Sequence, residues 1–194
     1  MTMADVLGSF SDNPKTEWLT QTGDDRNMKL LEDFTYTDPD GKVWVAPKGN
    51  VVNGASIPAA LWSTVGSPYT GEYRRASIVH DVACDNPAIQ RKDADKMFYF
   101  ACLAGGCSTA QAELLYVGVR IGAWFPKIRF WSEALASKPT ITFTHGPVSP
   151  TLTEESVRTT FREISADVQS YPEPLSFNQL ERLVDQHLAA KAKQ

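Results

Sequence analysis

Three residues in the middle of the chain, His80, Asp81 and Asp95, have types and spacing that suit acid–base chemistry. A carboxylate bonded to one imidazole nitrogen fixes the tautomer and leaves the other nitrogen free to take a proton from water near neutral pH. We therefore predict that Asp95 orients His80 as a general base. Asp81 lies about 100 degrees around a helix from His80, so we expect it to be an oxygen ligand for a hard cation.

Two predicted helices, residues 73–84 and 90–103, must bring these side chains together. The hydrophobic periodicity of the first helix places His80 at the border of the apolar face, where an imidazole can be partly dry and still reach a substrate. On the second helix Asp95 lies on the apolar face, and a buried carboxylate needs a partner. The short turn around Asn86 predicts that the helices are antiparallel neighbours, so His80 is the expected partner.

Each of these residues also has a simpler interpretation. A His/Asp pair between two helices is often a polar contact that only stabilises their packing. Asp81 alone is typical of a solvated surface charge. The simpler interpretation of the loop over residues 53–58 is a turn that packs under the helices.

Two other hydrolase classes fit less well. A serine hydrolase that uses Ser56 with His80 and Asp95 is an alternative, but residues 54–58 lack the G-x-S-x-G elbow. Metal-dependent phosphohydrolases need several histidines near the His-Asp doublet, whereas His145 and His187 lie outside the predicted core.

The elements around the helix pair predict an α+β, mainly helical fold. A turn at residues 38–41 predicts a β-hairpin or small sheet within residues 28–58, and a hydroxyl at Ser108 or Thr109 starts a third core helix. Two apolar stripes near the end of the chain predict a helical hairpin. We divide the chain into an N-terminal arm over 1–27, a core over 28–136, a linker over 137–150 and a helical hairpin over 151–194.

The composition limits the classes of partner that we expect and bears on whether the protein enters a membrane. With 194 residues and a formal net charge of -4, the chain has no overall basic surface, so we expect no nucleic-acid partner. From the absence of an apolar run of membrane-spanning length and of the pattern of a secretory leader, we expect neither a signal peptide nor a transmembrane segment. Residues 124–131 mix aromatic and basic side chains, which suits an interfacial contact with phospholipid or, more simply, closure of the core at a helix end.

Three strings carry a family resemblance: Asn53 to Pro58, Arg75 to Asp81, and Ala94 to Phe98. They resemble the family called domain of unknown function 1353 over roughly residues 28–122. The resemblance implies a phage or prophage origin, hence synthesis in the host cytoplasm, with association with the virion or release as further alternatives. The family supplies no activity. Asn53, Arg75 and Ser77 of these strings, together with Ser56 and with Tyr99 on the apolar face of the second helix, are further candidate site residues.

A more distant similarity is to the phospholipase A2 superfamily, in which a helix with His-Asp precedes a helix with Ala-Asp-x-x-Phe. It implies that His80 is the general base, Asp81 a calcium ligand and Asp95 the carboxylate that orients the histidine. The superfamily also has a glycine-rich calcium loop. Here the only candidates are the loops at Gly54 and at residues 66–71, and neither has the usual form.

Two functions follow as hypotheses. The first is a phospholipase A2-like ester hydrolase at a lipid surface, in which His80 activates water and calcium stabilises the oxyanion. The second is a non-catalytic phage accessory or virion protein that binds a protein partner or a second copy through residues 151–194. An enzyme needs the His80 ring accessible and titrating near neutral pH, whereas a structural role needs it only packed and hydrogen-bonded.

Overall fold

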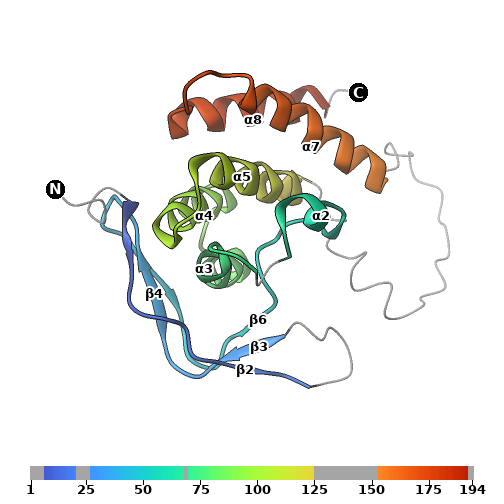
Figure 1. Cartoon of the computed structure of the whole chain (residues 1–194). Helices are drawn as coiled ribbons and strands as arrows, with labels where there is room; N and C mark the ends of the chain where they lie inside the picture. The colour runs from blue at the N-terminus through green and yellow to red at the C-terminus, as the bar shows by residue number, and fades with distance from the viewer. Residues whose placement is uncertain (1–6, 21–26, 68–69, 125–152, 192–194) are drawn as a thin grey trace, which may run out of the picture.

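The computed structural model of the chain describes residues 7–20, 27–67, 70–124 and 153–191. These residues form three layers, with small antiparallel sheets on one side, three long helices in the middle and a helical hairpin on the other side (Figure 1). The fold is therefore α+β and mainly helical, as predicted. No helix in this part of the chain is long and apolar enough to cross a membrane.

The predicted β-hairpin is present as β4 (Phe34–Thr37) and β5 (Val43–Ala46). Asp38 closes the turn, because its Oδ1 accepts hydrogen bonds from the backbone amides of Asp40 and Lys42 at 3.0 and 2.9 Å. Alternate side chains of both strands point into the core. The hairpin thus presents an apolar inner face to the helices.

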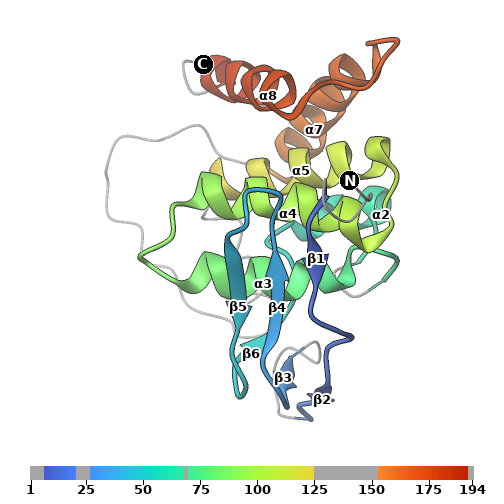
Figure 2. The same ribbon diagram turned by 90° about the vertical axis from the view of Figure 1, so that its left-hand side faces the viewer.

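The prediction that residues 1–27 form an irregular arm is wrong for two segments. β1 (Ser9–Phe10) pairs with β4 in a sheet of order β1-β4-β5. β2 (Thr16–Trp18) pairs with β3 (Met28–Leu30), which pairs with β6 (Val51–Val52). Both early strands are too short to show a period of two, so the local sequence gives little sign of them. Figure 2 shows the two small sheets along one side of the helices.

The central layer consists of α3 (Arg74–Asp85), α4 (Arg91–Gly105) and α5 (Thr109–Trp124), within one or two residues of the predicted helices. The sheets cover α3, and α4 lies between α3 and α5 (Figure 1). The helix α5 begins as expected, because the Ser108 hydroxyl accepts a hydrogen bond from the Gln111 amide at 3.2 Å. Two short helical segments, η1 (Ala59–Leu61) and α2 (Trp62–Val65), precede α3.

The C-terminal hairpin consists of α7 (Glu154–Gln169) and α8 (Phe177–Lys191). Its apolar stripes are not left open for a partner, since they are largely buried against α5, η1 and each other. The hairpin therefore closes the helical side of the core. This packing removes the structural reason for predicting that these stripes bind a second copy or another protein.

Several predictions concern residues outside the described part of the chain. They are the linker over 137–150 and all of the aromatic and basic segment 124–131 except Trp124. Within the described part, the loop over residues 53–58 packs under the helices as the simpler interpretation expects. A Cβ at Gly122 of α5 would clash with the carbonyl oxygen of Ser56, so this loop touches the helix backbone. The G-x-x-x-G pattern of α5 thus serves contact with a loop.

Candidate functional site

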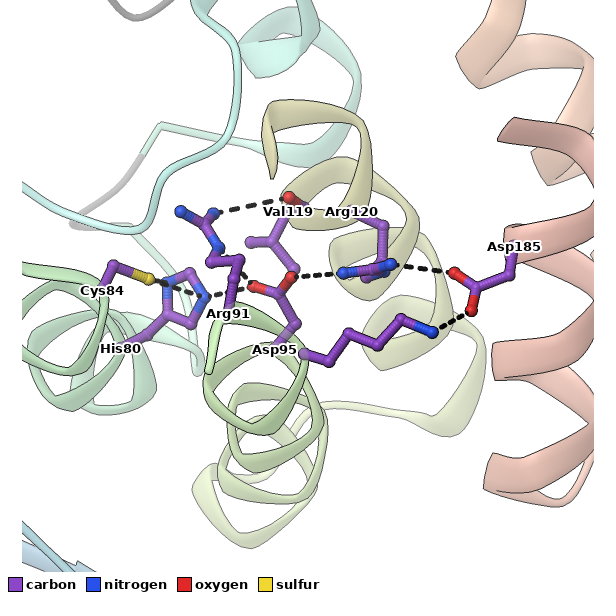
Figure 3. Close-up of polar contacts among 8 residues, drawn as sticks. His80, Cys84, Arg91, Asp95, Val119, Arg120 and Asp185 are labelled. Carbon is purple, nitrogen blue, oxygen red and sulfur yellow. Dashed lines mark hydrogen bonds and ion pairs between the residues drawn. The ribbon is translucent and has the colours of Figure 1, made fainter. Parts of the chain in front are cut away.

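The antiparallel pair α3 and α4 brings His80 and Asp95 together, as predicted. His80 Nε2 lies 2.8 Å from Asp95 Oδ1, and both side chains are fully buried (Figure 3). A carboxylate at Nε2 favours the tautomer that carries its proton there and leaves Nδ1 as the second ring nitrogen. The geometry is that of an oriented imidazole.

The predicted position of His80 at the edge of the core is wrong, because its ring has no exposed surface. The ring of Phe98 from α4 lies against it at 4.7 Å between centroids. Cys84, one helical turn later, places its Sγ 3.5 Å from Nε2 and 3.8 Å from Nδ1 of His80. Periodicity along α3 alone could not foresee that a second helix closes over this border.

Asp95 also binds two arginines that the sequence interpretation missed. Arg91 Nε lies 2.9 Å from Oδ1, and Arg120 Nη1 lies 3.1 Å from Oδ2. Burial raises the pKa of Asp95, but the hydrogen bond from His80 and the nearby positive charges outweigh this effect and lower it. The i, i+4 spacing of Arg91 and Asp95 on one helix could have revealed the first contact. Arg120 lies on a largely apolar helix and gave no such signal.

The network continues into the C-terminal hairpin. Arg120 Nη2 lies 2.8 Å from Asp185 Oδ1 on α8, and Lys92 of α4 binds the other oxygen of the same carboxylate. One connected set of charges therefore joins α3, α4, α5 and α8 (Figure 3). Lys92 and Arg120 both bind Asp185, so this carboxylate of α8 fixes the hairpin to two helices of the central layer.

The electrostatics favour the protonated form of His80. Burial acts to lower the pKa of His80, but the negative charge that Cys84 can carry and the hydrogen bond to Asp95 raise it to about 9. At neutral pH the ring is then an imidazolium, which donates protons and cannot accept one. A general base that works near neutral pH needs a lower pKa.

Asp81 is buried as well, with only 3% of its surface exposed, so its interpretation as a solvated charge is wrong. Its Oδ2 accepts a hydrogen bond from the backbone amide of Asn53 at 2.7 Å. The loop at Gly54, one of the two candidates for a calcium loop, thus lies beside Asp81. It offers an N–H donor to the carboxylate at this point, whereas a calcium shell needs oxygen ligands.

The remaining candidates do not join His80. The Ser56 hydroxyl oxygen is buried and has no hydrogen-bond partner in the described part of the chain, so no serine triad forms. Ser77 donates to the Tyr73 carbonyl at 3.2 Å. Arg75 lies over the ring of Phe10 at 4.6 Å.

Tyr99 packs among aromatic rings of α4, α5 and α8. Burial raises the pKa of Tyr99 to about 12, and the hydroxyl therefore stays protonated at neutral pH.

His80, Cys84 and Asp95 form the one group among the described residues whose ligand atoms could surround a metal ion, all within 4.8 Å of one another. Imidazole, thiolate and carboxylate are the ligand types that suit zinc. Two guanidinium groups already occupy both oxygens of Asp95. A divalent cation would have to displace them, so the residues fit a metal poorly.

Two relatives from Sinorhizobium fredii are similar to this chain. "Uncharacterized protein y4jT" is 35% identical over 117 residues, which are 60% of this chain and 34% of that protein. "Uncharacterized protein y4iH" is 38% identical over 97 residues, 50% of this chain and 41% of that protein. The chain thus spans less than half the length of either relative. No solved structure matches it significantly.

The family match covers most of the network but not the link through Arg120 to the hairpin. His80, Cys84, Arg91 and Asp95 lie inside the matched segment, whereas Arg120 and Asp185 lie beyond its end. Residues 28–119 of this chain match the model of the family described as "Protein of unknown function (DUF1353)", the family that the motifs of α3 and α4 predicted.

Proposed function

We propose that this chain is a non-catalytic accessory protein that acts by binding, and that the His80 network is a buried polar clamp. The observation that carries the proposal is the complete burial of His80, whose ring is in contact with Asp95, Cys84 and Phe98. A general base must reach the proton it removes, directly or through one water. An enclosed imidazolium does not meet that requirement.

The clamp has a physical role that needs no substrate. A buried carboxylate is costly unless its oxygens are hydrogen-bonded and its charge is compensated. His80, Arg91 and Arg120 supply both to Asp95. Since these partners come from three helices, the network fixes the register of the central layer. The phage or prophage origin of this chain remains a prediction from the sequence resemblance.

The second candidate function is the phospholipase A2-like ester hydrolase. One observation favours it: Asp95 contacts Nε2 of His80 at 2.8 Å, which leaves Nδ1 as the nitrogen for a water molecule. Asp81 follows His80 directly and lies beside the loop at Asn53. In this hypothesis Asp81 would hold calcium and the substrate would be a phospholipid. The route for substrate would have to open beside Cys84, the partly exposed member of the group.

Release of fatty acid from mixed anionic phospholipid vesicles, measured with calcium and with chelator, separates the two functions. Three proteins are compared: the native chain, His80→Gln and His187→Gln. His187 is a matched control, because its Nε2 also lies 2.8 Å from a carboxylate, that of Asp167, but on the outer hairpin. Far-ultraviolet circular dichroism checks that each variant is folded.

We expect no fatty acid from any of the three proteins. Calcium-dependent release by the native chain and by His187→Gln, lost in a folded His80→Gln protein, would reject the binding proposal and establish the hydrolase. Release that survives in both variants would point to a contaminant, which repeated purification removes.

A further inference from the structure

A second polar site lies on the opposite side of α3 from the His80 network. A cavity of about 640 Å³ opens between β2, β3 and the first turns of α3. Its volume is within the range of small-molecule sites, about 300–1,000 Å³. Figure 1 shows β2 and β3 beside α3, on the side away from the hairpin. Nothing in the network of Asp95 reaches this cavity.

Two neighbouring positive charges at this cavity form no ion pair with any described residue. Arg74 and Arg75 both line it, and neither makes an ion pair or a hydrogen bond with any residue in the described ranges. Arg75 is held in place by its cation–π contact with Phe10. The one acidic lining residue, Glu72, has its carboxylate beside Gly106. Within the described part of the chain, two guanidinium groups therefore line a hollow without forming an ion pair.

The opposite wall of the cavity is aromatic and apolar. Trp18, at the edge of the second sheet, has 59% of its surface exposed, the highest fraction among the large hydrophobic residues described. Met28 and Ile78 also line the cavity. A ring can stack on an exposed indole, and burial of that surface would contribute to binding.

We propose that this cavity binds an anion, a phosphate or carboxylate, that carries a flat or apolar group. A guanidinium group binds such anions through two parallel hydrogen bonds. Arg74 and Arg75 would take the anionic end, and Trp18 and Met28 would contact the apolar end. The inference gives the binding function proposed above a ligand class, and it does not depend on whether His80 is catalytic.

Phenyl phosphate is the probe, since it joins an anion to a ring. Its titration is followed in ¹H–¹⁵N spectra by the backbone amides of Arg74 and Arg75 and by the tryptophan indole N–H signals. The chain has five tryptophans, so Trp18→Phe assigns the relevant indole. Inorganic phosphate and phenol test each half of the probe separately. Co-sedimentation with phosphatidylglycerol or phosphatidylcholine vesicles distinguishes a lipid headgroup from a soluble phosphate.

We expect saturable shifts with phenyl phosphate, and weaker binding of phosphate or phenol alone. The double variant R74Q/R75Q should bind at least about tenfold more weakly, because two charge-assisted contacts are lost. Arg182→Gln is the control, since Arg182 lines a separate cavity on the hairpin. The single variant Arg75→Lys keeps the positive charge and should bind phenyl phosphate more tightly than R74Q/R75Q does. Linear, unsaturable shifts, or equal affinity in R74Q/R75Q and the native chain, would overturn the proposal.

Discussion

Asp95 and Arg120 form a buried ion pair, with 3.1 Å between Oδ2 and Nη1, across the end of the segment that matches the family. Arg120 is the first residue beyond that segment, and its other terminal nitrogen binds Asp185 of the C-terminal hairpin. Arg120 thus touches both the Asp95 carboxylate of the family segment and the hairpin, while Lys92 of α4 binds the other oxygen of Asp185. Of these two contacts with the hairpin, the buried one depends on Arg120.

Arg120→Gln should therefore destabilise the protein by about 3–5 kcal/mol, the usual cost of removing one partner of a buried ion pair. Chemical denaturation measures the loss, and hydrogen exchange should show faster exchange in α8 than in α3. Arg162→Gln is the control, because Arg162 forms an exposed pair with Glu155; we expect a change within about 0.5 kcal/mol there. Uniform acceleration of exchange along the chain would contradict a specific role in docking.

The pKa of His80 predicts how stability depends on pH. The folded pKa of His80, about 9, is above the ordinary value of 6.5, so the folded protein holds this proton more tightly than the unfolded chain does. This stabilisation is complete below pH 6.5 and is lost as pH rises through 9. Urea denaturation between pH 6 and pH 9.5 should show falling stability for the native chain.

Two variants test the origin of that slope. In His80→Gln the loss between pH 6.5 and 9 should disappear, whereas His187→Gln should keep it. Cys84→Ser removes a group that raises the folded pKa of His80, so the loss should still begin near pH 6.5 but end at lower pH and be smaller. An unchanged slope in His80→Gln would assign the pH dependence to other groups.

The sequence predicted the His80–Asp95 contact because it depends on two regular helices and a short turn. The apolar face of α4 contains Asp95, and the need of a buried carboxylate for a partner identified the histidine. The burial of His80 was missed because it depends on Phe98 and Cys84 closing over the ring. Periodicity within one helix shows which face is apolar, but it cannot show how far the neighbouring helix covers its edge.

Other errors have the same physical origin. The strand β1 forms only because Ser9 lies opposite Thr37, 28 positions later in the chain. Arg120 appears on a helix of apolar residues, where it gains a charged partner only after α4 and α8 have packed. In each case the missing information is a contact between distant segments. The hairpin at Asp38, whose turn contacts are local, was found correctly.

Close packing of α5 on the loop at Ser56 gives a third prediction. A Cβ at Gly122 would clash with the Ser56 carbonyl oxygen, a backbone atom that cannot rotate away. Gly122→Ala should therefore destabilise the fold by about 1–3 kcal/mol through overpacking. At Gly118 the nearest atom is a side-chain carbon of Ile57 at 3.3 Å, which can shift. Gly118→Ala should cost less in thermal denaturation, and a reversed order would contradict this packing.

Asp81 provides the fourth prediction, which concerns calcium. Its Oδ2 already accepts the Asn53 amide at 2.7 Å, so we expect the same thermal midpoint for the native chain in calcium and in chelator. Asp81→Ala should destabilise the chain by about 1–3 kcal/mol, because the Asn53 amide loses its acceptor. Asp81→Asn, which keeps an acceptor oxygen, should lose less. A calcium-dependent rise in the native midpoint that vanishes in Asp81→Asn would show instead that this carboxylate is a metal ligand, and would favour the hydrolase over the binding protein.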